Sequence, residues 1–400
     1  MKNSGHADLP LHNGKVPHWL ADRMARLGGE ISEVIVQDYG RDAFLTRLSD
    51  PLWFQSLGCV LGMDWHSSGI TTSVMGALKK ALNPRSKELG IFICGGRGKY
   101  SLQTPQELTA VANKTGLNGR ALVNSSKLSA KVDNTAVQDG YNIYLHSFIV
   151  TTEGKWAVVQ QGMNANNGFA RRYHWHSDSI KSFVQEPHKA VCGENKGPIL
   201  NLTAAESAET KEVILEISKN NPDRIIKEVR HIKMPRRHSV NGMDVDLKRL
   251  GSVLALAHDS GVSTFEDLLL TKGLGPRTLQ SLTLVSEIIY GTPSRFKDPA
   301  RFSFAHGGKD GHPFPVPLKV YDETIAVLKN VVNKAKIDRS DKKKALYNLH
   351  KQALNIESNF KPDRSQFDKI IQSERRMSYK YGGMTVSGPA LRHSGQLSLF

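Results

Sequence analysis

Two polar clusters in the first half of the chain carry residue types that could hold a divalent metal ion. Asp64 and His66 alternate, so both side chains point the same way if the backbone there is extended. Asp133 and Asp139 form a second cluster, and His146 follows in a predicted strand. Hard divalent cations accept carboxylate oxygen and imidazole nitrogen together. We therefore expect Asp64, Asp133 and Asp139 to bind Mg²⁺ or Mn²⁺ in a phosphodiester-cleaving site, with His66 and His146 moving protons. The alternative is a solvated loop at Asp64 that only caps a helix.

Basic residues near these clusters would stabilise phosphate charge. Arg171 and Arg172 follow the second cluster, and Arg97 and Lys99 lie in a glycine-rich segment after a predicted strand. We expect all four to contact the DNA backbone. The glycine-rich segment lacks the Walker spacing, which argues against an NTPase, and a plain loop is the alternative.

A loose nuclease pattern, Asp133 followed by Glu153 and Lys155, has a simpler explanation. Glu153 and Lys155 fall at the predicted tip of a β-hairpin, where Glu-Gly-Lys is ordinary turn chemistry. We therefore interpret these two residues as part of a turn.

The segment 265–291 resembles a helix-hairpin-helix, a module that holds the DNA backbone without reading sequence. Gly273 and Gly275 permit a tight turn and close backbone approach, and Pro276 suits the first turn of a helix. We expect Gly273, Gly275 and Arg277 to bind phosphate at the positive end of that helix. A tight helical corner that serves only packing is the alternative. Arg277 stands where related glycosylases place a nucleophilic lysine, and an arginine stays protonated, so we do not expect a glycosylase.

The last five residues resemble the peptide by which bacterial replication and repair proteins bind the DNA-polymerase sliding clamp. Gln396 would supply hydrogen bonds, while Leu397, Leu399 and Phe400 would provide apolar contacts in a pocket. The preceding segment 382–389 is rich in Gly and Ser, as flexible tethers are. We expect the sliding clamp to be a partner; a chance apolar C-terminus is the alternative.

Periodicity and turn residues predict the elements that must position these side chains. We expect a helical stretch over Trp19–Leu48, a strand at Gly90–Cys94, and a hairpin of Tyr141–Thr151 with Trp156–Gln160. Capping boxes at Thr203–Glu206 and Ser263–Glu266 would each open a helix. Two further helices are expected at Asp322–Val332 and Lys342–Leu354.

These elements predict a mixed α/β N-terminal domain, an all-α helix-hairpin-helix domain and a flexible tail. The expected boundaries are 1–238 for the α/β domain, 239–330 for the hairpin domain, 331–380 for a basic helical extension and 381–400 for the tail.

Charge is the unusual feature of the composition. The 400 residues include 54 Lys and Arg against 38 Asp and Glu, a net charge of +16. Such a chain favours nucleic acid, and with no long apolar run a membrane partner is not expected. Cys59, Cys94 and Cys192 are widely spaced, which is typical of reduced, buried thiols in a cytoplasmic protein.

Most of the chain resembles a bacterial and archaeal domain-of-unknown-function family, number seven-six-three. The resemblance lies in segments 48–79, 132–150, 156–164, 170–175 and 302–316. It implies a soluble prokaryotic protein associated with nucleic-acid processing, but no mechanism. Together with the motifs, we expect a metal-dependent DNA nuclease of repair or replication. A non-enzymatic DNA-binding adaptor and an RNA-processing enzyme are the alternatives.

Overall fold

The computed structural model describes residues 9–10, 18–63, 69–164, 169–223, 225–226, 247–300, 318–359, 384–385 and 388–389. The chain divides into two compact units, Met1–Asn355 and Ile356–Phe400. In the second unit, β10 (Met384–Thr385) pairs antiparallel with β11 (Gly388–Pro389). The expected clamp-binding residues Gln396–Phe400 lie outside the described residues. The fold below is that of the first unit.

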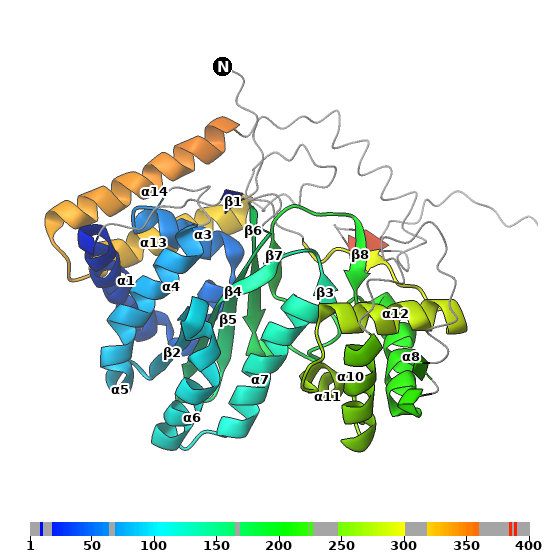
Figure 1. Ribbon diagram of the computed structural model, residues 1–400. Helices are drawn as coiled ribbons and strands as arrows, with labels where there is room; N and C mark the ends of the chain where they lie inside the picture. The colour runs from blue at the N-terminus through cyan, green and yellow to red at the C-terminus, as the bar shows by residue number, and fades with distance from the viewer. Residues whose placement is uncertain are drawn as a thin grey trace, which may run out of the picture. The chain divides into compact units, whose positions relative to one another are not determined.

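A six-stranded antiparallel sheet forms the centre of the first unit (Figure 1). Its strand order is β1-β6-β5-β4-β2, and β7 pairs with β6. The strands are β1 (Leu9–Pro10), β2 (Ile91–Arg97), β4 (Asn142–Thr151), β5 (Trp156–Met163), β6 (Phe169–His176) and β7 (Ala190–Cys192). β2 continues through Gly95 and Gly96 and is therefore longer than the strand expected at Gly90–Cys94.

Helices cover both faces of this sheet, because successive strand residues alternate between two buried cores. Ile91 and Ile93 of β2 pack on one face, against α1, α3 and α4, while Phe92 and Cys94 pack on the other, which includes side chains of α6 and α7. The helices are α1 (His18–Tyr39), α2 (Arg41–Ser49), α3 (Pro51–Val60), α4 (Gly69–Leu82), α5 (Ser86–Leu89), α6 (Thr104–Thr115) and α7 (Gly119–Lys131). The expected mixed α/β class is confirmed.

The helical stretch expected over Trp19–Leu48 is two helices. α1 ends at Tyr39 and α2 begins at Arg41, with Gly40 between them at φ 85°. That left-handed conformation breaks a continuous helix, and glycine adopts it without steric cost. The apolar periodicity continues across the break because both helices pack on the same core.

The predicted hairpin is confirmed as β4 and β5, with Gly154 at φ 85° in its turn. At the tip, Arg41 Nε donates to both Glu153 carboxylate oxygens at 3.0 Å, and Lys155 Nζ donates to Asp42 Oδ2 at 2.6 Å. These bonds join the hairpin to α2. The turn interpretation of Glu153 and Lys155 agrees with this arrangement.

The second half of the unit adds helices and a small sheet. β3 (Val137–Gln138), β8 (Pro198–Asn201) and β9 (Phe296–Lys297) form an antiparallel sheet in the order β3-β8-β9. The helices are α8 (Ala208–Lys219), α10 (Leu247–Asp259), α11 (Phe265–Leu270) and α12 (Pro276–Tyr290). The boundary expected at residue 238 lies outside the described residues. Ile214 of α8, before it, and Leu254 of α10, after it, belong to the same core as Phe148 of the sheet, so these helices share one compact unit.

One expected capping box is absent and the other is shifted by one residue. α8 begins at Ala208, after a short 3-10 turn η5 (Ala205–Ser207), because the Thr203 hydroxyl donates to Asn201 Oδ1 at 2.6 Å instead of capping a helix. α11 is capped by Thr264, whose hydroxyl accepts from the Asp267 amide at 3.1 Å, while Asp267 accepts from the Thr264 amide.

The two expected C-terminal helices are α13 (Leu318–Lys334) and α14 (Arg339–Asn359). Leu328 of α13 and Leu349 of α14 join the core formed with α1, α3 and α4. The three cysteines are buried, as expected. None of the helices in the described ranges is long and apolar enough to cross a membrane.

Candidate functional site at the polar end of the sheet

Polar side chains gather at one end of the six-stranded sheet, where strands begin and finish. β2 and β5 end there and β4 and β6 begin there, and the register sets Gly96 opposite His146, His146 opposite Gln160, and Gln161 opposite Arg172. We call this end of the sheet the polar end. It comprises residues 95–97, 142–146, 160–163 and 169–172. Residues far apart in sequence therefore lie side by side.

Asp133 is the centre of a buried network beside the polar end. It lies in η3 (Val132–Ala136), a single π-helical turn that directly follows α7, and it is fully buried. Its Oδ2 accepts from Gln160 Nε2 at 2.6 Å and from Trp175 Nε1 at 2.9 Å, and its Oδ1 lies 2.5 Å from His188 Nε2. Burial raises the pKa of Asp133, and the nearby His188 opposes that shift.

The same network fixes the protonation of His146. Gln160 donates its amide hydrogens to Asp133 and to the Ser129 carbonyl, so its Oε1 must accept from His146 Nδ1 at 2.8 Å. His146 Nε2 is then an acceptor for the Ser126 hydroxyl at 2.8 Å. Burial lowers the pKa of His146 to about 4, which favours the neutral imidazole, and the two hydrogen bonds select this tautomer. Asp133 and His146 are thus connected through Gln160, as parts of one network.

His188 completes an Asp–His pair that no sequence pattern indicates. Its ring lies edge-on to Trp175 at 4.7 Å between centroids. The Asp133 carboxylate orients such an imidazole and favours a proton on the nitrogen that faces it. Only 5% of the His188 side chain is exposed, so access to it is narrow. His188 stands 55 residues from Asp133 in a segment without periodicity, and nothing in its sequence context indicates the pairing.

Asp139 belongs to a second, separate cluster. Its Oδ2 accepts from Arg171 Nη1 at 2.9 Å and from the Tyr173 hydroxyl at 2.6 Å. Arg171 also makes a two-bond contact with Asp298, at 2.9 Å for both pairs of atoms. Burial opposes the charge of Arg171, but the carboxylates of Asp139 and Asp298 outweigh it and raise the pKa of Arg171. The guanidinium therefore stays charged between two buried acids.

Arg172 points to the opposite face of β6. Its Nη2 donates to Gln55 Oε1 at 2.9 Å, its Nε donates to His174 Nε2 at 2.8 Å, and the guanidinium lies 4.6 Å from the centre of the Phe54 ring. Both Arg171 and Arg172 are fully buried. This corrects the expectation that they contact DNA phosphate, since neither presents its guanidinium to solvent.

The described residues do not bring the expected metal ligands together. Asp133 and Asp139 accept hydrogen bonds in separate clusters, and the described ranges contain no group of three or more His, Cys, Asp or Glu side chains placed for one ion. Asp64 and His66 lie outside the described residues.

The hairpin of α11 and α12 is held against α7 and β3, the elements that flank the η3 turn with Asp133. Lys131 Nζ, at the end of α7, donates to the Leu274 carbonyl at 2.6 Å, and Gln138 Nε2 donates to the Pro276 carbonyl at 2.8 Å. Gly273 has φ 88°, as the expected tight turn requires, and Gly275 precedes α12 without a side-chain cap. Lys272 and Arg277 are exposed on either side of this turn. Lys131 and Gln138 were not identified from the sequence.

Arg97 and Lys99 lie at the polar end beside β2, the outer strand of the sheet, and both are exposed. Arg97 closes β2, and Lys99 follows in η2 (Gly98–Gln103), a 3-10 turn. Each has an aromatic neighbour: the Arg97 guanidinium is 5.9 Å from the Tyr144 ring centre and the Lys99 ammonium is 5.7 Å from that of Tyr100.

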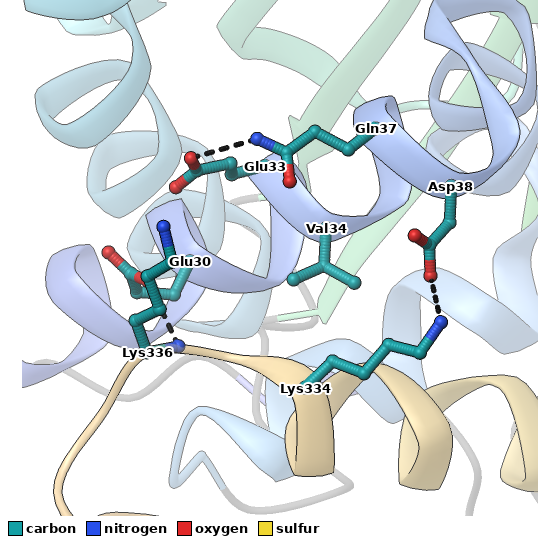
Figure 2. Close-up of a pocket in the computed structure, with 7 residues that line it drawn as sticks. All are labelled: Glu30, Glu33, Val34, Gln37, Asp38, Lys334 and Lys336. Carbon is teal, nitrogen blue, oxygen red and sulfur yellow. Dashed lines mark hydrogen bonds and ion pairs between the residues drawn. The ribbon is translucent and has the colours of Figure 1, made fainter.

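A small polar cavity of about 110 Å³ lies between α1 and α13, away from the polar end (Figure 2). Among its lining residues, Lys334 Nζ donates to Asp38 Oδ2 at 2.5 Å, Gln37 Nε2 donates to Glu33 Oε1 at 3.1 Å, and the Lys336 backbone amide donates to Glu30 Oε2 at 3.2 Å. We interpret it as a packing gap spanned by the Lys334–Asp38 ion pair.

One family of known proteins matches this chain. The model of the family described as "Protein of unknown function (DUF763)" matches residues 5–316. The chain belongs to this family. No curated protein and no solved structure gives a significant match.

The DUF763 match spans the strands that form the polar end, β2, β4, β5 and β6, together with α11 and α12. It ends before α13, so α13, α14 and the C-terminal tail lie outside the matched range.

Proposed function

We propose that this DUF763 protein binds the backbone of nucleic acid at the polar end of its sheet, as a DNA repair or replication protein. The observation that supports this most is the seating of the α11–α12 turn. Lys131 and Gln138 hold the turn through the Leu274 and Pro276 carbonyls, so its opposite side, with Lys272 and Arg277, is left exposed. The net charge of +16 favours the same class of partner.

The start of α12 supplies the groups that bind phosphate. Within the described ranges, the first two amides of α12, at Arg277 and Thr278, donate no hydrogen bond to the protein. Such amides and the positive end of the helix dipole attract an anion, and Gly275 allows the backbone to approach closely. Contacts of this kind hold the backbone and carry no sequence information.

Phosphodiester cleavage with Mg²⁺ or Mn²⁺ is the enzymatic part of the proposal. Its candidate ligands are Asp64, Asp133 and Asp139, with His66 and His146 for proton transfer. In the described geometry, a metal at Asp133 or Asp139 must replace a protein donor such as Gln160 or Tyr173. The non-enzymatic adaptor needs no such rearrangement, and it is the alternative. An RNA-processing enzyme is a further alternative, since the backbone contacts do not separate DNA from RNA.

Recruitment by the sliding clamp is the third part. The peptide Gln396–Phe400 would bind the clamp while the folded unit contacts the DNA that passes through the ring.

Incubation of the purified chain with labelled single-stranded DNA, duplex DNA and RNA tests binding and cleavage together. Each is measured with EDTA, with Mg²⁺ and with Mn²⁺, and an Asp64→Ala variant serves as the comparison. We expect salt-sensitive binding in all three conditions and cleavage only with metal, with Asp64→Ala retaining binding and losing cleavage. Binding without cleavage in any condition supports the adaptor. Absence of binding to every nucleic acid contradicts the proposal.

A further inference from the structure

An exposed aromatic and basic surface lies at the β2 side of the polar end. It consists of the exposed side chains of Arg97, Lys99 and Tyr100 and the half-buried ring of Tyr144, and we call it the platform. Tyr100 is 52% exposed, and Leu102 beside it is 81% exposed. A Cβ placed on Gly96 would lie 3.4 Å from the Tyr100 Cβ, so η2 folds back against the end of β2. Each of the two cations of the platform has an aromatic ring beside it, Tyr144 for Arg97 and Tyr100 for Lys99.

The backbone beneath the platform is held in place by hydrogen bonds. The Gly95 amide donates to Glu107 Oε2 at 2.8 Å, and the Gly95 carbonyl accepts from Lys79 Nζ at 2.7 Å. In η2, the Ser101 hydroxyl donates to the Gly98 carbonyl at 2.6 Å, and the Thr104 hydroxyl donates to the Ser101 carbonyl at 2.7 Å. A fixed backbone means that little conformational entropy is lost when a ligand contacts Tyr100.

Tyr144 is placed on the platform by an irregularity in the sheet. Ile143 pairs with Gly162 and Leu145 pairs with Gln161, so Tyr144 is the extra residue of a β-bulge in β4. A bulge re-aims the side chain that it carries, and bulges are frequent beside functional sites. The ring is half-buried and faces the Arg97 guanidinium.

We propose that the platform binds unpaired nucleobases, so that the polar end takes single-stranded nucleic acid there. This inference rests on the proposed function and specifies its substrate. Tyr100 would stack on a base, Arg97 and Lys99 would contact the flanking phosphates, and Tyr144 would support Arg97 from below.

The chemistry of the surface favours an unpaired strand over a duplex. Bases in a duplex are already stacked on one another and present only their edges in the grooves. An exposed tyrosine ring stacks on a base only where that base is free, and aromatic side chains combined with cationic ones are typical of proteins that hold single strands. The hairpin turn, in contrast, offers only backbone amides and cations, which suit either form.

Fluorescence anisotropy with labelled oligothymidylate, oligouridylate and a blunt DNA duplex tests the inference. The variants are Tyr100→Ala and Tyr100→Phe, and Tyr347→Ala is the control because Tyr347 is 62% exposed on α14, outside the platform. We expect Tyr100→Ala to weaken single-strand binding roughly tenfold and to leave duplex binding nearly unchanged. Tyr100→Phe keeps the ring and should bind like the wild type. Thermal unfolding of each variant checks that it folds.

Several outcomes overturn the inference. If Tyr100→Ala binds single strands as well as the wild type does, or weakens duplex binding equally, Tyr100 does not stack on bases. A wild-type protein that binds duplex but neither oligonucleotide contradicts the platform and leaves the proposed function standing. A wild-type protein that binds none of the three contradicts both. Loss of oligouridylate binding in Tyr100→Ala, without loss of oligothymidylate binding, supports stacking with RNA as the ligand.

Discussion

The Asp133 carboxylate and the His146 imidazole belong to one buried network, and burial shifts their pKa values in opposite directions. The pKa of Asp133 rises and that of His146 falls to about 4, because burial disfavours the charged form of each group. Gln160 bonds to both and fixes the direction of every hydrogen bond between them. A network of this kind is stable only while each buried polar group keeps its partner.

His146 should make the stability of the fold depend on pH. Its pKa is about 4 in the folded chain and 6.5 without the protein environment, so the unfolded chain binds the proton first as the pH falls. The free energy of unfolding should therefore be insensitive to His146 above pH 6.5. It should fall between pH 6.5 and about 4, by roughly 3 kcal/mol in total. Urea denaturation at several pH values measures this loss.

The matched variants are His146→Gln in the network and His350→Gln on the exposed surface of α14. His146→Gln should be less stable at neutral pH and lose less stability on acidification, since one depressed histidine is gone. His174, also buried with a lowered pKa, leaves part of the slope in place. The same pH slope in wild type and His146→Gln would show that His146 is not the titrating group.

At the scale of elements, hydrogen bonds and a shared hydrophobic core hold the α11–α12 hairpin against the rest of the first unit. Lys131 of α7 and Gln138 of β3 donate hydrogen bonds to its turn. Its own side chains Leu268 and Leu282 are buried in the core that it shares with the sheet. The exposed outer side carries Lys272 and Arg277. Backbone binding by this element should therefore be measurable as an electrostatic contribution without a change in fold.

The double variant Lys272→Ala/Arg277→Ala should weaken DNA binding and its salt dependence. If both cations neutralise phosphates, the slope of log K against log salt should become shallower by about two units. Lys87→Ala/Lys343→Ala removes the same charge from exposed positions on α5 and α14 and should keep the wild-type slope. Binding isotherms at several salt concentrations give the slopes. Equal slopes in both doubles would argue against the hairpin as the phosphate site.

Local sequence signals predicted the helices and strands of this fold well, but they did not predict which elements contact one another. The β4–β5 hairpin follows from alternation and the Gly154 turn, and the α11–α12 pair follows from its glycines and caps. Such features depend on residues close together in the chain. The capping box at Thr203 failed because a tertiary partner, Asn201, took its hydroxyl.

The candidate site was harder to predict. Its residue types can be read from short segments, but their arrangement depends on contacts between segments that are distant in the chain. Arg171 and Arg172 look equivalent in sequence, yet the pleat of β6 buries them on opposite faces with different partners. The pairing of Asp133 with His188 depends on how distant segments meet. A buried polar residue and an exposed one also look alike in sequence, so burial of both arginines could not be foreseen.

At the scale of the whole molecule, one continuous unit carries both the sheet and the hairpin. Asp298, just after β9, bonds to Arg171 of β6, and α13 and α14 pack on the core of the N-terminal helices. The segment from Ile356 onward forms a separate unit. Changes confined to the last residues should therefore leave the first unit intact.

Deletion of residues 396–400 should abolish binding to the bacterial sliding clamp without affecting stability. Short clamp-binding peptides of this kind bind at roughly micromolar Kd, and simultaneous DNA contact would raise the effective affinity. Titration of purified clamp with the full chain and with the truncated chain measures the difference, and a Leu399→Ala/Phe400→Ala variant isolates the apolar contacts. Equal binding by all three, or binding by none, would mean that the resemblance of the tail is accidental.

The bond between Arg171 and Asp298 also bears on how the protein is made. The two residues are 127 positions apart, and Lys131 and Leu274 are 143 positions apart. A growing chain cannot form either contact until its later partner has been synthesised. Until then Arg171 lacks one of the two acids that offset its burial, and burying a charge without sufficient partners is costly. The polar end is therefore completed late in translation, and a chain that stops before residue 298 would lack the acid that completes the Arg171 cluster.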